Sequence, residues 1–296
     1  MTIQETIRQA RSKGTAVPAF NIPYLPMIEP VAKAIADEKI PSIIHVARVE
    51  WINFQSQSLE AVAKEYRLHE KPGFTHLGLD HIPVIDEEQH QVDYLPIIKR
   101  AIDAGFESVM IDGSRLDLEG NIAATKIVSD LVHASGIACE GEIGAVMGHE
   151  SGPQKPYEEI FSTKLGFTRL DDARRFALES HCDWMSVAVG NIHGAVAEAT
   201  RGQKKPKARL DIDHIAALYR VAWIPLVLHG GSGINIEYVR RAIAAGIAKI
   251  NIGTEIRQVY EESMVQVNDV DVAREAVYKR TRELIALIFA RNRQTI

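Results

Sequence analysis

The chain has 296 residues, with 34 Lys and Arg against 39 Asp and Glu, and a formal net charge of −5. Its 46% hydrophobic and 25% charged residues are typical of a globular protein, which excludes a disordered chain, a collagen-like repeat and a disulfide framework. The acidic balance argues against a general nucleic-acid-binding protein, because such proteins present a basic face. Length alone suggests two domains, but α/β barrels of about 250 residues form one.

Features of the chain ends and thiols predict a cytoplasmic protein. The first residues show no apolar core behind a basic tip, so we expect no signal peptide. No uncharged apolar stretch reaches the ~18 residues of a membrane span. Cys139 and Cys182 each lie in an apolar run, which predicts buried free thiols in a reducing compartment. The basic tract Gln203–Lys207 favours a solvated loop, with a role near an anionic substrate as the alternative.

Short apolar runs alternate with amphipathic stretches along the chain. The runs are Ala16–Ile22, Pro41–Ala47, Phe74–Leu79, Ser108–Ile111, Ile137–Ile143, Trp184–Val189, Pro225–Leu228 and Ala248–Ile252. The stretches between them carry apolar residues at helical spacing, as in Ile28, Val31 and Ile35 or in Ile122, Ile127 and Leu131. Glycines that end helices precede three of the runs, at Gly105, Gly136 and Gly246.

This alternation predicts a parallel sheet covered on both faces. Eight units at about 30-residue spacing fit a (β/α)₈ TIM barrel, with residues 1–296 as one domain. A doubly wound sheet is the alternative, but it would need a Gly-rich turn where Asn21, Ile22 and Pro23 follow the first run.

Two connections are longer than barrel loops usually are, Gly144–Lys164 and Gly190–Arg209. Loops of this length in a compact fold are more often functional than idle, so we predict that both are active-site lids. Val272–Arg291 reads as a long helix with Val277, Leu284 and Ile288 on one stripe. We expect it to pack on the barrel exterior or on a partner subunit.

Three histidines stand at predicted strand ends, where the active site of a barrel lies: His81, His193 and His229. Three imidazoles that converge there predict a zinc site with coordination positions open to substrate. The other eight histidines are interpreted as surface residues. Asp112 and Glu142 also end strands, either as metal partners or as a turn-forming Asp and a helix-capping Glu.

The turn His229–Gly233 is rich in glycine and precedes a helix. Its backbone N–H groups and the Ser232 hydroxyl could hold a phosphate at the helix N-terminus, beside Asn251 and Thr254. Phosphate sites after strands seven and eight recur in this fold, which favours this reading over a simple tight turn.

These motifs together resemble the class II, zinc-dependent ketose-bisphosphate aldolases, which include the fructose- and tagatose-bisphosphate enzymes. The resemblance extends from Pro18 to about Arg257. It follows six ordered segments, Leu79–His81, Gly105–Ser114, Glu140–Gly144, Val189–Gly194, Leu228–Gly233 and Lys249–Asn251.

The resemblance implies that His81, His193 and His229 bind zinc and that Asp112 and Glu142 match alternative metal positions. Asp80 matches the acid/base carboxylate, and Glu150 matches a mobile-loop glutamate that moves the C3 proton. A Na⁺ or K⁺ ion near the phosphate and a homodimer or homotetramer are further implied. The substrate-binding candidates are Asn21, Gly194, Gly230, Ser232, Asn251 and Thr254.

The function implied is reversible cleavage of a phosphorylated ketose to dihydroxyacetone phosphate and an aldehyde. A zinc-dependent hydrolase or epimerase on the same fold, and a non-catalytic aldolase-like subunit, are the alternatives.

The chain departs from the family in several places that bear on substrate, among them the following three. A longer stretch runs from Ile82 to Asp93, Ala47 replaces a common Ser, and Gly253 leans away from the fructose-type enzyme. His45 and Arg48 either recognise an anionic group of the substrate or form salt bridges at the rim.

Overall fold

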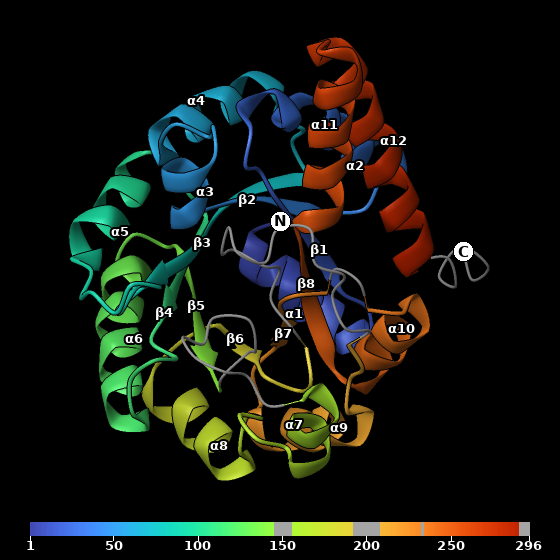
Figure 1. Cartoon of the computed structure of the whole chain (residues 1–296). Helices are drawn as coiled ribbons and strands as arrows, with labels where there is room; N and C mark the ends of the chain where they lie inside the picture. The colour runs from blue at the N-terminus through green and yellow to red at the C-terminus, as the bar shows by residue number, and fades with distance from the viewer. Residues whose placement is uncertain (145–155, 192–207, 232–233, 290–296) are drawn as a thin grey trace.

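The computed structural model describes residues 1–144, 156–191, 208–231 and 234–289 (Figure 1). In this part of the chain, eight parallel strands pair in chain order and the last returns to the first, so the sheet closes into a barrel. The strands are β1 (Val17–Asn21), β2 (Ser42–Ala47), β3 (Thr75–Pro83), β4 (Ser108–Asp112), β5 (Ala138–Ile143), β6 (Trp184–Val187), β7 (Leu226–Leu228) and β8 (Ile247–Ile252). The predicted TIM barrel is confirmed.

The helices form a ring around the barrel, except α1, which precedes the first strand (Figure 1). They are α1 (Ile3–Lys13), η1 (Leu25–Met27), α2 (Ile28–Glu38), α3 (Arg48–Asn53), α4 (Leu59–His69), α5 (Tyr94–Asp103), α6 (Leu118–His133), α7 (Tyr157–Thr163), α8 (Leu170–Glu179), α9 (Ile212–Ala222), α10 (Ile236–Ala245), α11 (Thr254–Val267) and α12 (Val270–Phe289). As predicted, Gly105, Gly136 and Gly246 follow the ends of helices. The three glycines have positive φ angles between 71° and 130°.

The strands are buried along almost their whole length because helices cover the outside and side chains fill the inside. Seven of the eight end within two residues of their predicted ends. The exception is β3, which was predicted to end at Leu79 and continues to Pro83. The polar pair Asp80 and His81 reads as the end of a strand, but here it belongs to the strand.

Helix α1 closes the N-terminal end of the barrel and lies behind the strands in Figure 1. Its Ile3, Ile7 and Ala10 form a buried cluster with inward-facing residues of six strands, among them Trp184 and Val227. This cluster makes that end of the barrel a packed core, so a substrate has access only from the opposite end.

The last two helices lie together on the outside of the barrel, and α12 packs on α2 and α11. The predicted apolar stripe of Val277, Leu284 and Ile288 is buried in this contact. The expected packing of this helix on the barrel exterior is therefore confirmed. The helix begins at Val270, two residues before the predicted start.

The structure also tests what the sequence predicted for α6, for the first long connection and for the two cysteines. Ile127 of α6 was counted among the apolar residues at helical spacing, but it is 51% exposed, and Val128 and Val132 face the core. The second half of the first long connection forms α7 rather than loop. Cys139 and Cys182 are free and buried, as predicted.

Residues 145–155 and 192–207, which hold most of both predicted lids and the basic tract Gln203–Lys207, lie outside the described residues. None of the described helices is long and apolar enough to cross a membrane.

Candidate active site and metal centre

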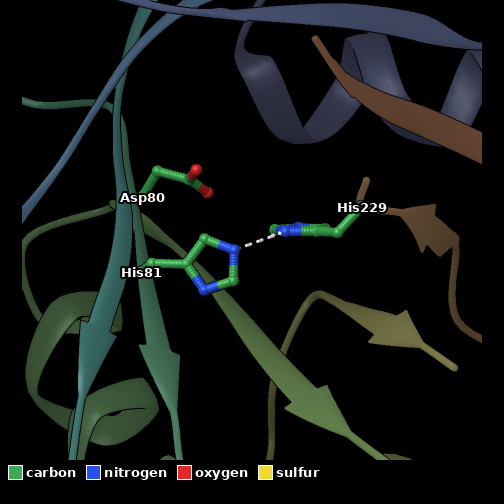
Figure 2. A group of neighbouring side chains, drawn as sticks. All are labelled: Asp80, His81 and His229. Atoms are coloured by element: carbon green, nitrogen blue, oxygen red, sulfur yellow. Dashed lines mark hydrogen bonds between the residues drawn. The ribbon is translucent and has the colours of Figure 1, made fainter. Parts of the chain in front are cut away.

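Asp80, His81 and His229 meet at the mouth of the barrel (Figure 2). The first two come from the C-terminal part of β3, and His229 follows β7 directly. His81 Nε2 lies 2.7 Å from His229 Nδ1, and one ligand atom from each of the three side chains lies within 4.8 Å of the others. Two imidazoles beside a carboxylate are donors that zinc binds in proteins, so this group fits a divalent metal ion.

An irregularity in β3 brings the two neighbouring side chains to the same place. Successive residues of a strand normally point to opposite faces of the sheet. Here the register with β4 shifts between Leu79 and Ile82, and His81 has a φ of 36°, in the left-handed region. A non-glycine residue held in that region costs about 1–3 kcal/mol, and such positions cluster at functional sites. The bulge therefore serves the site at the expense of regular pairing.

Asp112 at the end of β4 and Glu142 in β5 flank the other ring nitrogen of His81. His81 Nδ1 lies 3.4 Å from Asp112 Oδ2 and 3.7 Å from Glu142 Oε2, and the three side chains form a second group able to hold a metal. Burial raises the pKa of Glu142 to about 7, and the charge of Asp112 adds to this rise. Burial alone would lower the pKa of His81, but the surrounding carboxylates, Asp80 foremost, raise it to about 10. This negative charge favours a bound cation.

Glu140 fixes the orientation of His229 from inside the barrel. Its Oε1 lies 2.8 Å from His229 Nε2, while its Oε2 accepts hydrogen bonds from Lys249 Nζ at 2.6 Å and from the Trp184 indole. Burial opposes ionisation of Glu140, but Lys249 and His229 lower its pKa to about 2. A carboxylate at Nε2 makes that nitrogen the protonated one, so the lone pair of Nδ1 faces His81 and the metal position.

Asp80 is held by amide groups on both sides. Asn21 Nδ2 donates to Asp80 Oδ2 at 2.9 Å, and Asn251 Nδ2 donates to Asp80 Oδ1 at 3.0 Å. Both asparagines were predicted to bind substrate, and the structure places their amide N–H groups on the carboxylate of Asp80. Asn21 ends β1 and Asn251 lies in β8, which pairs with β1, so adjacent strands supply the two donors.

Two histidines interpreted as surface residues are buried, so that expectation is wrong for them. His45 lies inside the barrel on β2, with its Nδ1 3.7 Å from Asp80 Oδ1, and burial together with Lys249 lowers its pKa to about 3. His76 in β3 lies with its Nδ1 2.6 Å from Glu107. Both lie within buried strands, where even a polar side chain is taken into the interior.

Other predicted site residues are distributed between described and undescribed parts of the chain. Gly230 follows His229 with a φ of 64°, and Thr254 begins α11 just after β8, so both stand at neighbouring strand ends. The remaining candidates lie outside the described residues: Glu150, His193, Gly194 and Ser232.

Sequence reasoning missed Glu140, Lys249 and the position of His45. A signal was present for Lys249, because a lone lysine inside the apolar run Ala248–Ile252 requires a buried partner. The partner itself could not be identified from the sequence, because it comes from β5 across the barrel.

The model of the class II fructose-bisphosphate aldolase family matches residues 1–293. The chain belongs to this family. It is therefore an enzyme, a lyase that acts on a carbon–carbon bond, and the predicted family is confirmed.

Two curated relatives are both 6-phospho-5-dehydro-2-deoxy-D-gluconate aldolases. The protein of Shouchella clausii is 31% identical over 249 residues, which cover 84% of this chain and 77% of the relative. The protein of Halalkalibacterium halodurans is 31% identical over 277 residues, covering 92% and 87%. The crystal structure of the YdjI aldolase from Escherichia coli K12 superposes with a TM-score of 0.78 at 27% identity, covering 97% of this chain and 96% of that one.

Proposed function

We propose that this class II aldolase is zinc-dependent and reversibly cleaves a phosphorylated ketose to dihydroxyacetone phosphate and an aldehyde. The observation that carries this proposal is the convergence of Asp80 with His81 and His229, whose imidazole nitrogens face each other at 2.7 Å. A zinc-dependent hydrolase or epimerase could use the same imidazoles and carboxylate, so it is the family match over residues 1–293 that favours an aldolase over them.

The bound ion would supply Lewis-acid stabilisation of the negative charge that develops as the C3–C4 bond breaks. His81, His229 and His193 would hold it. Asp80 takes the proton of the C4 hydroxyl during cleavage and returns it to the aldehyde oxygen in the reverse direction. Asp80 is ionised and so able to accept a proton: burial opposes the charged form, but His81, His45, His229 and Lys249 outweigh it and lower the pKa.

Other residues complete the proposed mechanism. Glu150 is proposed to move the C3 proton of the dihydroxyacetone phosphate half. Gly194, Gly230, Ser232 and Thr254 are proposed to bind that half of the substrate, with Na⁺ or K⁺ near its phosphate. Backbone N–H groups at the start of a helix bind phosphate well. Helices α10 and α11 follow β7 and β8, so the ends of these two strands fit a phosphate site.

The far end of the substrate is proposed to be anionic. The name of the two relatives describes a sugar acid with a phosphate at its other end, and the family name describes a bisphosphate. Arg48 begins α3 at the mouth, directly after Ala47, which pairs with Asp80. Its Nη1 lies 3.9 Å from Asp86, so a rim salt bridge and recognition of an anionic substrate are both compatible with its place.

A cleavage panel tests substrate and mechanism together. It contains fructose and tagatose 1,6-bisphosphates, 6-phospho-5-dehydro-2-deoxygluconate, and ketose 1-phosphates that carry no charge at the other end of the sugar. EDTA should abolish cleavage and zinc should restore it, whereas a borohydride-trappable lysine adduct or full activity without metal would contradict the proposal. Exchange of the C3 proton of dihydroxyacetone phosphate with solvent separates an aldolase from a hydrolase.

The proposal extends to the assembly and location of the enzyme. We place it in the cytoplasm as one domain that forms a homodimer or homotetramer. Light scattering of the purified enzyme measures the number of subunits.

A further inference from the structure

Asn191 is a buried polar residue just beyond the end of β6 that the proposed mechanism does not use. Only 2% of it is exposed. Its Nδ2 donates a hydrogen bond of 2.9 Å to the backbone carbonyl of His229, which follows the neighbouring strand β7. Its Oδ1 accepts a hydrogen bond of 2.8 Å from the backbone N–H of Val189. One side chain therefore joins the chain beyond β6 to the chain beyond β7.

The two hydrogen bonds fix the orientation of the Asn191 amide. An amide nitrogen only donates and an amide oxygen only accepts. A flip would set the Nδ2 hydrogens against the N–H of Val189 and Oδ1 against the carbonyl oxygen of His229, so both bonds would be lost. Buried backbone groups without a partner cost free energy, so only one orientation of the amide is favourable.

The position of this bridge follows from the way in which β6 ends. The strand ends at Val187, and side chains accept the backbone N–H groups of the next two residues. Thr168 Oγ1 accepts from the N–H of Ala188 at 2.8 Å, and Asn191 Oδ1 accepts from that of Val189. This segment is therefore held in place by specific hydrogen bonds, and it gives the Asn191 amide a fixed base.

His229 is held at two points as a result. Glu140 of β5 fixes its ring, with Oε1 2.8 Å from Nε2, and Asn191 fixes its backbone. The other ring nitrogen, Nδ1, lies 2.7 Å from His81 Nε2 at the proposed zinc position (Figure 2). A ring that is held only at its far nitrogen can still shift with its backbone, whereas a functional side chain must stay within about 0.5 Å of its productive position.

A bridge between strand ends that serves stability alone is also present in this barrel. The hydroxyl of Thr168, a residue that is 1% exposed, donates to the carbonyl of Ile143 at 2.7 Å and accepts from the N–H of Ala188. It thus joins β5 to the end of β6, but neither of its two partners is a proposed zinc ligand. Asn191 differs because its bridge ends on His229.

We propose that Asn191 is a positioning residue for the zinc site and that it acts through the backbone of His229. The proposal rests on the proposed zinc-dependent function, in which His229 holds the metal. Without Asn191, the turn that begins at His229 loses its hydrogen bond to the segment beyond β6, and the ring presents Nδ1 to the ion less precisely. Loss of Asn191 should therefore weaken zinc binding in addition to any loss of stability.

The test compares Asn191→Ala and Asn191→Ser with the wild type as zinc-loaded enzymes. Zinc affinity is measured by competition with a chelator, and stability by the melting temperature in excess zinc. The visible absorption of the Co²⁺-exchanged enzymes reports the coordination of the ion. Asn191→Ala should bind zinc about tenfold or more weakly, as is typical when a residue that orients a metal-binding histidine is lost, and its cobalt spectrum should change.

Asn191→Ser separates zinc binding from folding. A serine hydroxyl can satisfy one of the two backbone groups, but it is too short to bridge both. This variant should therefore lose less stability than Asn191→Ala and show a similar fall in zinc affinity.

Thr168→Val provides the matched control, because it removes a buried hydroxyl bridge at the same strand end and preserves the shape of the side chain. Its melting temperature should fall, since two buried backbone groups lose their partner. Its zinc affinity should stay within about twofold of the wild type, well below the effect of losing a positioning residue, and its cobalt spectrum should be unchanged.

Two results would overturn the role of Asn191 alone. Wild-type zinc affinity and an unchanged cobalt spectrum in both Asn191 variants would show that His229 needs no support from β6. An equal fall in zinc affinity in Thr168→Val would make Asn191 structural.

Failure of the proposed function gives different results. A wild-type enzyme that binds no zinc would overturn the metal site and the role of Asn191 together. A wild-type enzyme that binds zinc but cleaves no ketose phosphate would overturn the proposed reaction, while the zinc affinities of the variants would still decide the role of Asn191.

Discussion

Asp80 shows how single residues set the chemistry of this site. A carboxylate alone in a protein interior would take up a proton, because burial disfavours the charged form. Several neighbours of Asp80 offset the cost of burying its charge: two amides donate to its oxygens, and His81 and His45 are among the groups that lower its pKa. The side chain is thus kept ionised inside the barrel mouth.

Replacing Asp80 with Asn should test this role, because the shape is preserved and the base is lost. We expect cleavage to fall about 10²–10⁴-fold, the usual contribution of a general acid/base. The zinc content, measured by elemental analysis, should remain near that of the wild type. Asp86→Asn, on the following loop, is the control and should leave kcat nearly unchanged. Loss of zinc in Asp80→Asn would instead make Asp80 a metal ligand.

The buried ion pair between Lys249 and Glu140 supports the metal position indirectly. Lys249→Met should leave Glu140 charged without its main partner, which typically costs about 3–5 kcal/mol of stability. Glu140, no longer held by Lys249, would orient His229 less firmly, so zinc affinity should fall about 10–100-fold. Denaturant unfolding and zinc titration measure the two effects. The double variant with Glu140→Gln should regain stability but not zinc affinity, and equal stability of both variants would contradict the pairing.

The residues of the site were most readily predicted from the sequence where polar groups stand at the end of an apolar run. Asp80, His81 and His229 stand out because polar groups and glycines interrupt apolar runs there, and barrels place their chemistry at those ends. Glu140 and His45 lie within runs that read as core. Their partners come from strands far along the chain, so only the closed barrel reveals that they surround Asp80 and His229.

At the scale of elements, the pairing of β2 with β3 determines where Asp80 lies. His45 stands opposite Gly78 in the register, and Ala47 stands opposite Asp80. A Cβ atom at position 78 would overlap the ring of His45 and lie 2.8 Å from Ser108 Oγ. Gly78 thus makes room for the imidazole beside Asp80. The strands themselves were predicted from apolar runs, but the bulge in β3 was not, because its polar residues resemble a strand end.

Gly78→Ala should therefore disturb both stability and catalysis. We expect a loss of about 1–3 kcal/mol in the free energy of unfolding, as for other overpacked cores, and a lower kcat because His45 must move. His45→Ala in the same chain should relieve the overlap. Denaturant unfolding of the four proteins of this double-mutant cycle should give a coupling of about 0.5–3 kcal/mol. Simple additivity would show that the two residues do not contact each other.

At the scale of the whole molecule, the two ends of the barrel have different roles. The N-terminal end is filled by α1 and by the apolar cluster around Ile7 and Trp184. The opposite end holds the charged and polar groups of the site. In barrels of this kind, the first end contributes stability and the second contributes chemistry. A substitution at the closed end should then separate the two properties.

Ile7→Ala tests this separation, because Ile7 is fully buried and its truncation leaves a cavity under the barrel. We expect the free energy of unfolding to fall by about 2–5 kcal/mol. Arg8→Ala, one residue along α1, is the control: its side chain is 68% exposed and its ion pair with Asp183 spans 3.5 Å, so the loss should stay below about 1 kcal/mol. In both variants, kcat per folded molecule at 25 °C should match the wild type, since the site lies at the other end of the strands. A large fall in kcat for Ile7→Ala at a temperature where the protein is fully folded would show that packing at the closed end is coupled to the position of Asp80.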